Sequence, residues 1–108
     1  MQIFKLKDMK GGWLIGDFEP SILRTQDFEV ACVKHTKGDN WPVHYHKEAT
    51  EINVMIKGKM RIQDTILTEG DIFVIKPYEV ADPVFLEDCE VVCIKTPSCP
   101  GDKYIVQS

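Results

Sequence analysis

Apolar positions along the chain alternate with polar ones or gather into short runs such as residues 72–75. Glycine, proline, aspartate or asparagine interrupts these segments about every 8–12 residues, which is the spacing expected of an all-β sandwich or barrel. Strict alternation has the period of a strand, in which successive side chains point to opposite faces. We therefore expect an all-β chain with little helix and with strands at residues 13–18, 28–35, 44–46, 51–57, 59–64, 72–75, 83–86 and 90–96.

The alternation also predicts which side chains face the interior. If Glu51 points inward, Asn53 and Met55 do so as well. The aliphatic side chains at positions 52, 54 and 56 then point outward, where they need cover. The amino-terminal segment or a second subunit can supply this cover, and we expect a homodimer. In the next strand, either Met60 and Ile62 or Arg61 and Gln63 face inward, depending on the turn at Gly58, and we favour the first pair because it fills the core.

Composition and charge narrow the class of protein. Hydrophobic residues make up 44% and charged residues 28% of the 108 residues, which are ordinary values for one globular domain, here residues 1–108. The net charge is −4 and no segment concentrates lysine and arginine, which argues against a nucleic-acid partner. No apolar stretch approaches the roughly 20 residues of a membrane span, and the amino terminus lacks the apolar core of an export signal. We expect no membrane partner and a cytoplasmic location.

The four cysteines are expected to be reduced thiols. If Cys89 and Cys93 lie on one strand, their Cα atoms are about 13 Å apart, beyond the roughly 7 Å that a disulfide allows. No two of the four cysteines form a C-x2-C pair, so the chain lacks the two close ligand pairs that a structural zinc site usually needs. Reduced thiols are the usual state in the cytoplasm.

Residues 44–51 hold the candidate chemistry of the chain. His44 and His46 are two positions apart, so on a strand both imidazoles point to the same face. Glu51 begins the next strand after a short connection and can lie beside them. Two imidazoles and one carboxylate leave open positions on a divalent ion. The alternative is that these are ordinary polar residues on a half-exposed strand.

The residues Gly38, His44, His46, Glu51 and Gly58 match the pattern G-x5-H-x-H-x3,4-E-x6-G at every spacing. In this, the chain resembles the cupin superfamily, whose first motif has that form. The resemblance implies a single cupin β-barrel, of the double-stranded β-helix or jelly-roll type, with site motifs at residues 38–58 and 70–82. It also implies one divalent metal ion bound by His44, His46 and Glu51, and it agrees with a homodimer because cupins commonly pair.

The second cupin motif, G-x5-P-x-G-x2-H-x3-N, is matched only in part. Gly70 and Pro77 correspond if one extra residue lies between them, and Glu79 then stands in place of the glycine. Asp82 stands in place of the histidine and Leu86 in place of the asparagine. Asp82 is therefore a candidate fourth ligand and catalytic proton-transfer group, although it can instead cap a turn. A second carboxylate would favour Fe or Mn, whereas Zn, Ni and Cu remain possible.

The resemblance predicts a metal-dependent enzyme that acts on a small oxygen-rich molecule held in the barrel. The candidate reactions are those of a dioxygenase or of an isomerase, epimerase or lyase, and the fold alone does not select among them. The alternative is a non-catalytic cupin that binds a small sugar or organic acid. Trp41, Tyr45 and Tyr78 flank the motifs and can stack on a ligand, although aromatic residues in small barrels more often pack. His35 is either an acid or base in the outer shell of the site or a surface residue, and we favour the surface.

Overall fold

The structure is a computed structural model that describes residues 1–107. Within them, two single-turn 3-10 helices, η1 (Leu6–Asp8) and η2 (Lys10–Gly12), precede ten strands. The strands are β1 (Trp13–Ile15), β2 (Glu29–His35), β3 (His44–Tyr45), β4 (Thr50–Lys57), β5 (Lys59–Ile62), β6 (Thr65–Thr68), β7 (Ile72–Ile75), β8 (Val84–Phe85), β9 (Cys89–Thr96) and β10 (Tyr104–Ile105). The all-β prediction is confirmed.

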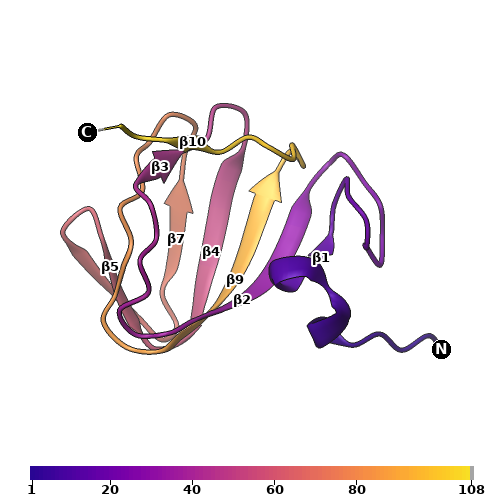
Figure 1. Cartoon of the computed structure of the whole chain (residues 1–108), viewed down its shortest axis with the longest axis horizontal. Helices are drawn as coiled ribbons and strands as arrows, with labels where there is room; N and C mark the ends of the chain where they lie inside the picture. The colour runs from indigo at the N-terminus through magenta and orange to yellow at the C-terminus, as the bar shows by residue number, and fades with distance from the viewer. Residues whose placement is uncertain (108) are drawn as a thin grey trace.

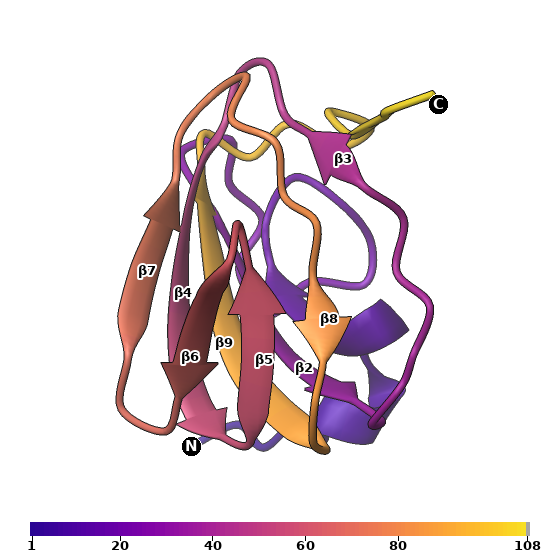
Figure 2. The ribbon, with the colours of Figure 1, turned by 90° about the vertical axis from the view of Figure 1, so that its left-hand side faces the viewer.

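The strands form three antiparallel sheets that enclose an interior. The largest has the order β1-β2-β9-β4-β7, and the smaller ones have the orders β6-β5-β8 and β10-β3. Figure 1 shows the long strands of the large sheet side by side, with β3 and β10 across one end of the barrel. Figure 2 shows β6, β5 and β8 facing that sheet from the other side. The two ends of the barrel therefore differ, because β3 and β10 cross one end and the apolar core described next lies toward the other.

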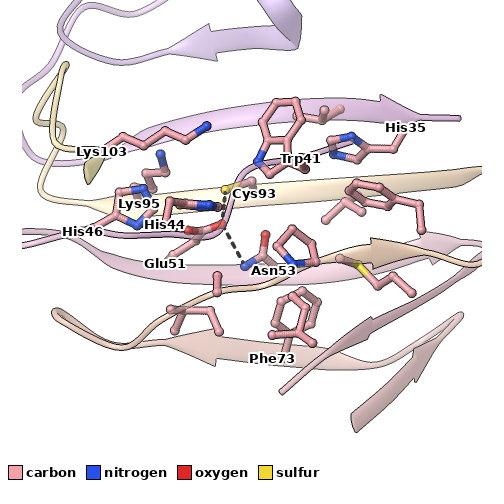
Figure 3. Close-up of a pocket in the computed structure, with 18 of the residues that line it drawn as sticks. His35, Trp41, His44, His46, Glu51, Asn53, Phe73, Cys93, Lys95 and Lys103 are labelled. Carbon is pink, nitrogen blue, oxygen red and sulfur yellow. Dashed lines mark hydrogen bonds and ion pairs between the residues drawn. The ribbon is translucent and has the colours of Figure 1, made fainter. Parts of the chain in front are cut away.

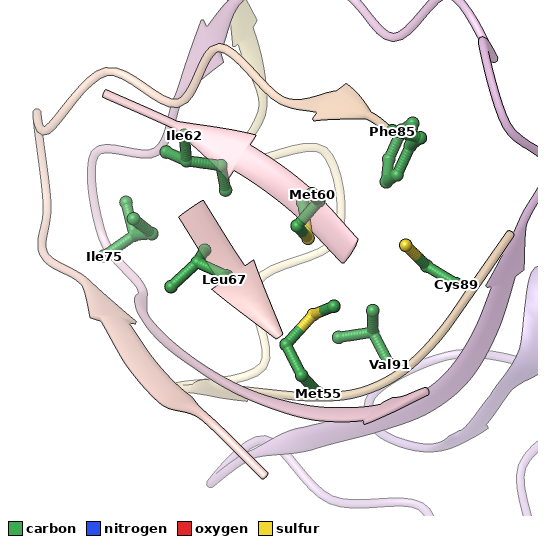
Figure 4. Close-up of a cluster of buried hydrophobic side chains, with 8 residues drawn as sticks. All are labelled: Met55, Met60, Ile62, Leu67, Ile75, Phe85, Cys89 and Val91. Atoms are coloured by element: carbon green, nitrogen blue, oxygen red, sulfur yellow. The ribbon is translucent and has the colours of Figure 1, made fainter. Parts of the chain in front are cut away.

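The apolar core fills the end of the barrel between β4 and β5. Met55, Met60 and Ile62 are buried there together with the other members of the core cluster, Leu67, Ile75, Phe85, Cys89 and Val91 (Figure 4). Asn53 is buried on the same face of β4, and Arg61 between the two inward residues of β5 is exposed. The inward positions predicted from alternation are therefore confirmed. Each such side chain contributes about 1.5–3 kcal/mol by its removal from water.

The hairpin between β5 and β6 differs from the sequence prediction. The strand expected at residues 59–64 ends at Ile62, because Gln63 and Asp64 take positive φ angles of 52° and 61°. Two central residues with positive φ form the tight turn that suits the twist of a β-hairpin. The chain reverses there, and β6 pairs back along β5 with Thr65 opposite Ile62. Neither β6 nor the short β10 is among the strands expected from the sequence.

The outer surface of the large sheet carries an apolar patch. Side chains that point outward from β2, β9, β4 and β7 lie in two cross-strand rows, which we call the outer apolar face: Val30, Ile94, Ile52, Val74 and Cys32, Val92, Val54, Ile72. Its edge on β7 is the most open part, since Ile72 is 66% and Val74 46% exposed. Both rows consist of uncharged side chains.

Two further expectations concern the cysteines and the membrane. All four cysteines are free, and Cys89 and Cys93 lie on the single strand β9 as expected. Among residues 1–107, no helix has the length and apolar character needed to cross a membrane.

Candidate functional site

Three side chains from two neighbouring segments converge at the β3 end of the barrel. His44 lies in β3, His46 follows it, and Glu51 lies near the start of β4. One ligand atom from each lies within 4.8 Å of the others, which is close enough for a single ion to contact all three (Figure 3). His44 is 7% and His46 3% exposed, so both imidazoles are largely removed from solvent. The structure thus brings together the three residues of the first motif.

The hydrogen bonds of the two imidazoles leave ring nitrogens for a ligand. Nδ1 of His44 lies 2.8 Å from the backbone oxygen of Pro42, and because a carbonyl only accepts, Nδ1 carries the proton and Nε2 keeps its lone pair. In His46, Nδ1 lies 3.4 Å from Oε2 of Glu51. Nε2 of His46 is buried and has no hydrogen-bond partner among residues 1–107. A buried polar atom without a partner is costly, and a bound ion is one group that removes this cost.

Burial also sets the protonation state of the pair. It lowers the pKa of His44 and of His46 below the usual value, and the nearby ammonium of Lys95 lowers the pKa of both further. The imidazoles are therefore neutral near neutral pH. Neutral imidazole is the form that binds a metal ion. The donor set of two neutral imidazoles and one carboxylate fits a divalent transition metal with open coordination positions.

The carboxylate of Glu51 is oriented by two neighbours on the inner face. Nδ2 of Asn53 donates to Oε1 at 3.2 Å, and the thiol of Cys93 donates to the same oxygen at 3.4 Å. Burial raises the pKa of the Cys93 thiol, so it remains a protonated donor. These contacts occupy Oε1 and leave Oε2 on the side of His46. Sequence alternation predicts that Asn53 faces inward, but the role of Cys93 was not predicted.

Asp102 holds the connection between His46 and Glu51 in place. Its carboxylate accepts hydrogen bonds from the backbone N–H groups of Lys47, Glu48 and Ala49 at 2.9–3.0 Å. Asp102 itself is only 6% exposed. Burial alone would raise the pKa of this carboxyl, but the three N–H donors lower it below the usual value. The site therefore depends on the carboxy-terminal segment, which the sequence motifs do not cover.

The structure also corrects the register of the second motif. Counted without an extra residue, the motif places Tyr78, Ala81 and Phe85 where the family has Gly, His and Asn. Tyr78 has the positive φ of 68° that favours glycine. Ala81 is buried and exchanges backbone hydrogen bonds with His44, so it occupies the inward position beside the first ligand. Its methyl group offers no ligand atom.

Asp82, the neighbour of Ala81, points the other way. Its side chain is exposed, and Oδ1 accepts a hydrogen bond from the backbone N–H of Gln63 at 2.8 Å. Asp82 thus caps the β5–β6 turn and lies outside the cluster of His44, His46 and Glu51. The expected fourth ligand and catalytic group at Asp82 is therefore corrected to the turn-capping alternative. The physical reason is the register, because a shift of one residue turns a side chain to the opposite face.

A cavity of about 370 Å³ lies beside the three residues and extends toward the core. His35 and Trp41 form part of its wall, and the His35 ring stacks on Phe85 with ring centres 4.1 Å apart. His35 is thus a cavity residue rather than the surface residue favoured from the sequence. Tyr45 stacks between two other tyrosines, Tyr78 and Tyr104, with ring centres 6.0 and 5.5 Å away. Of the three candidate aromatic residues, Trp41 is the one that lines the cavity.

Comparison with known proteins identifies the fold. No protein-family model and no curated protein sequence matches the chain. Among solved structures, an uncharacterized conserved protein with a double-stranded β-helix domain from Klebsiella pneumoniae is similar with a TM-score of 0.72 and 20% identity, over 99% of this chain and 93% of that one. KdgF from a Halomonas species is similar with a TM-score of 0.63 and 26% identity, over 70% of this chain and 74% of that one.

A third similar structure is the DMSP lyase DddQ from Ruegeria pomeroyi, with a TM-score of 0.73 and 15% identity, over 87% of this chain and 49% of that one. Proteins described as RmlC-like cupins from Ralstonia eutropha and Shewanella frigidimarina also match with a probability of 1.00. The chain therefore has the double-stranded β-helix fold of the cupin superfamily.

Proposed function

We propose that this chain binds one divalent metal ion through His44, His46 and Glu51 and acts as an enzyme on a small molecule in the adjacent cavity. The observation that carries the proposal is the buried Nε2 of His46, which lacks a hydrogen-bond partner among residues 1–107 and lies in a cluster of three ligand residues. Two imidazoles and one carboxylate suit Fe(II) or Mn(II), and Zn, Ni or Cu can also bind such a set.

The arrangement of the site supports catalysis rather than a structural role for the ion. A structural metal site is usually closed by four protein ligands, whereas this set offers three and Ala81 adds none. A bound divalent ion would act as a Lewis acid on the oxygens of a substrate. The candidate reactions are those of a dioxygenase or of an isomerase, epimerase or lyase. The neighbour from Ruegeria pomeroyi is itself named a lyase.

The side chains around the ligands have separate roles in this proposal. Asn53 and Cys93 orient Glu51, and the backbone of Pro42 orients His44. Burial lowers the pKa of His35, so its imidazole is neutral and able to accept a proton from a substrate in the cavity. The apolar wall of the cavity limits the access of water to the reacting groups.

The alternative is a non-catalytic protein that binds a small sugar or organic acid in the same cavity. Exchange of the metal separates the two functions. For an enzyme, turnover depends on the identity of the ion, whereas for a binding protein the ion changes only the affinity. The cavity of about 370 Å³ is suited to a small molecule in either case.

Elemental analysis of untagged protein tests the proposal. We expect about one equivalent of Fe or Mn in the wild type and none in His46→Ala. Glu51→Gln removes a proposed ligand, and Glu48→Gln is its matched control because Glu48 is an exposed carboxylate in the same connection. Loss of metal in Glu51→Gln with retention in Glu48→Gln supports the site. No metal in the wild type, even after reconstitution with Fe(II), Mn(II) or Zn(II), would overturn it.

We also propose that two copies of the chain pair through the outer apolar face. Its two rows contain uncharged side chains in a regular array, so the face is complementary to a second copy of itself about a twofold axis. The four free cysteines are consistent with a cytoplasmic location, where thiols remain reduced.

A further inference from the structure

Two lysine ammonium groups stand beside the three proposed ligands. In the register of the large sheet, Lys95 of β9 lies between Glu51 of β4 and Glu29 of β2, so its side chain shares their inward face. Lys103 precedes β10 and lines the same cavity. Figure 3 shows both side chains at the end of the cavity that holds His44 and His46. Positive charge is therefore concentrated where the metal site opens to a ligand.

The charge of these two lysines is matched only in part by nearby carboxylates. Nζ of Lys95 lies 4.0 Å from Oε1 of Glu29, a long ion pair, and Glu29 also accepts a hydrogen bond from Oγ of Ser98 at 3.0 Å. Nζ of Lys103 lies 4.4 Å above the ring of Trp41 and has no ion-pair partner among residues 1–107. Burial lowers the pKa of Lys103, and the charge of Lys95 lowers it further.

A metal ion would increase this imbalance. A divalent ion bound by two neutral imidazoles and Glu51 keeps one net positive charge. The ammonium of Lys103 adds to this charge, whereas that of Lys95 is offset in part by Glu29. Charges of one sign in a cavity with low-dielectric walls focus the field and attract a ligand of the opposite sign. The end of the cavity near Lys95 and Lys103 therefore favours an anionic group.

The opposite end of the cavity has a different chemistry. It is lined mostly by apolar side chains, with the imidazole of His35 stacked on one of them: Met60, Ile62, Phe73, Ile75, Phe85 and Val91. The hydroxyl groups of a sugar would lose their hydrogen bonds with water on entering this region. An aliphatic or aromatic group would instead be stabilised there by its removal from water.

We propose that the site takes a small carboxylic acid whose carboxylate lies near Lys95 and Lys103 and whose apolar body fills the inner part of the cavity. This inference rests on the proposed metal-dependent function and specifies its ligand class. It distinguishes an apolar organic acid from the sugars and sugar acids that the same fold can hold. Lys103 is the specificity-determining residue because its ammonium lacks a protein carboxylate partner within residues 1–107.

Binding measurements on the metal-loaded protein test this ligand class. Mn(II)-loaded protein is titrated calorimetrically with 4-methyl-2-oxopentanoate, with its neutral methyl ester and with galacturonate. We expect the acid to bind at least about tenfold more tightly than the ester, which lacks the charge, and than the sugar acid, which lacks the apolar body. Equal affinity for the acid and the ester, tighter binding of galacturonate, or no binding of the acid would overturn the inference.

Substitution of the lysine separates this inference from the proposed metal site. Lys103→Met keeps the length of the side chain and is expected to weaken binding of the acid about tenfold while leaving Mn(II) affinity within about threefold. The matched control is Lys47→Met, because Nζ of Lys47 also lies over an aromatic ring, that of Tyr104, at 4.2 Å. If the wild type fails to bind Mn(II), the metal site is wrong. If it binds Mn(II) and Lys103→Met does not weaken the acid, only the ligand class is wrong.

Discussion

Oδ2 of Asp102 lies 3.0 Å from the backbone nitrogen of Ala49, although 53 positions separate the two residues in the sequence. The same carboxylate also accepts from the two residues before Ala49, so it holds the whole connection between the second histidine and Glu51. Pairing of β10 with β3 fixes the carboxy-terminal segment against the strand that carries His44. The distance between His46 and Glu51 is therefore set in part by the carboxy-terminal segment, which lies outside the first motif.

Asp102→Asn is expected to weaken both the fold and the metal site. In the asparagine side chain, an NH2 donor replaces one of the two accepting oxygens. This donor would face backbone N–H groups, so hydrogen bonds of about 1.5–3 kcal/mol each are lost. Urea denaturation should show a loss of about 2–3 kcal/mol in the free energy of unfolding. The Kd for Mn(II) should rise about tenfold, as for other residues that orient metal ligands. In the control Asp82→Asn, the affected carboxylate is exposed and the Kd should not change; an equal rise in both variants would contradict the geometry.

Ala81→His should create a fourth ligand. Ala81 lies in the cavity wall and its backbone pairs with that of His44, so an imidazole at this position points toward the three ligands. We expect the affinity for Zn(II), measured by competition with a chromophoric chelator, to increase at least about tenfold. Asp82→His should leave it unchanged because position 82 faces outward. If Asp82→His bound Zn(II) more tightly and Ala81→His did not, position 82 would face the site, and the second motif would have one extra residue before Pro77.

The two glycines of the first motif should respond differently to alanine. At Gly58, a Cβ would lie 2.2 Å from the backbone oxygen of Asp88 and 2.8 Å from Cα of Cys89, so the backbone must move. Gly38 has a positive φ of 80° but open space around it. Gly38→Ala should therefore cost about 1–2 kcal/mol of unfolding free energy from backbone strain alone, and Gly58→Ala distinctly more. Chemical denaturation of both variants measures the difference, and equal losses would show that strain alone explains both positions.

The stability of the metal-free protein should depend on His35 at mildly acidic pH. Burial against Phe85 and Trp41 lowers the pKa of His35 from the usual 6.5, so the unfolded chain binds a proton more readily than the folded one. The contribution of His35 to stability is therefore complete above about pH 6.5 and is lost as the pH falls toward the folded pKa. His35→Phe should show a smaller loss between pH 7 and pH 5 in urea denaturation. The same pH slope in both proteins would contradict this assignment.

Charged substitutions on the outer apolar face should prevent dimer formation. Ile72→Lys places an ammonium in the open part of the face, where a second copy would bury it. Ile66→Lys is the control because Ile66 is 50% exposed on β6 in the opposite sheet. Light scattering coupled to gel filtration should give a dimer for the wild type and Ile66→Lys and a monomer for Ile72→Lys. A monomeric wild type at micromolar concentration would remove the proposed pairing.

The parts of the molecule that could be predicted from sequence are those with a local pattern. Alternation along β4 indicates that Asn53 and Met55 face inward, and the spacing of the first motif identifies the three clustered residues. The hairpin turn at Gln63 was missed because glutamine rarely has a positive φ. Asp102 was missed because its partners lie on a distant segment, and no short pattern reports such a contact.

The alanine at position 81 affects how the protein would retain its ion. If the ion has the three protein ligands proposed above, a chelating small molecule would complete its coordination sphere, and the ion and the small molecule would bind in a linked way. By thermodynamic reciprocity, each would raise the affinity of the other by the same factor. The fraction of protein that carries metal in a cell would then rise and fall with the concentration of its ligand, and depletion of the ligand would release the ion to competing chelators.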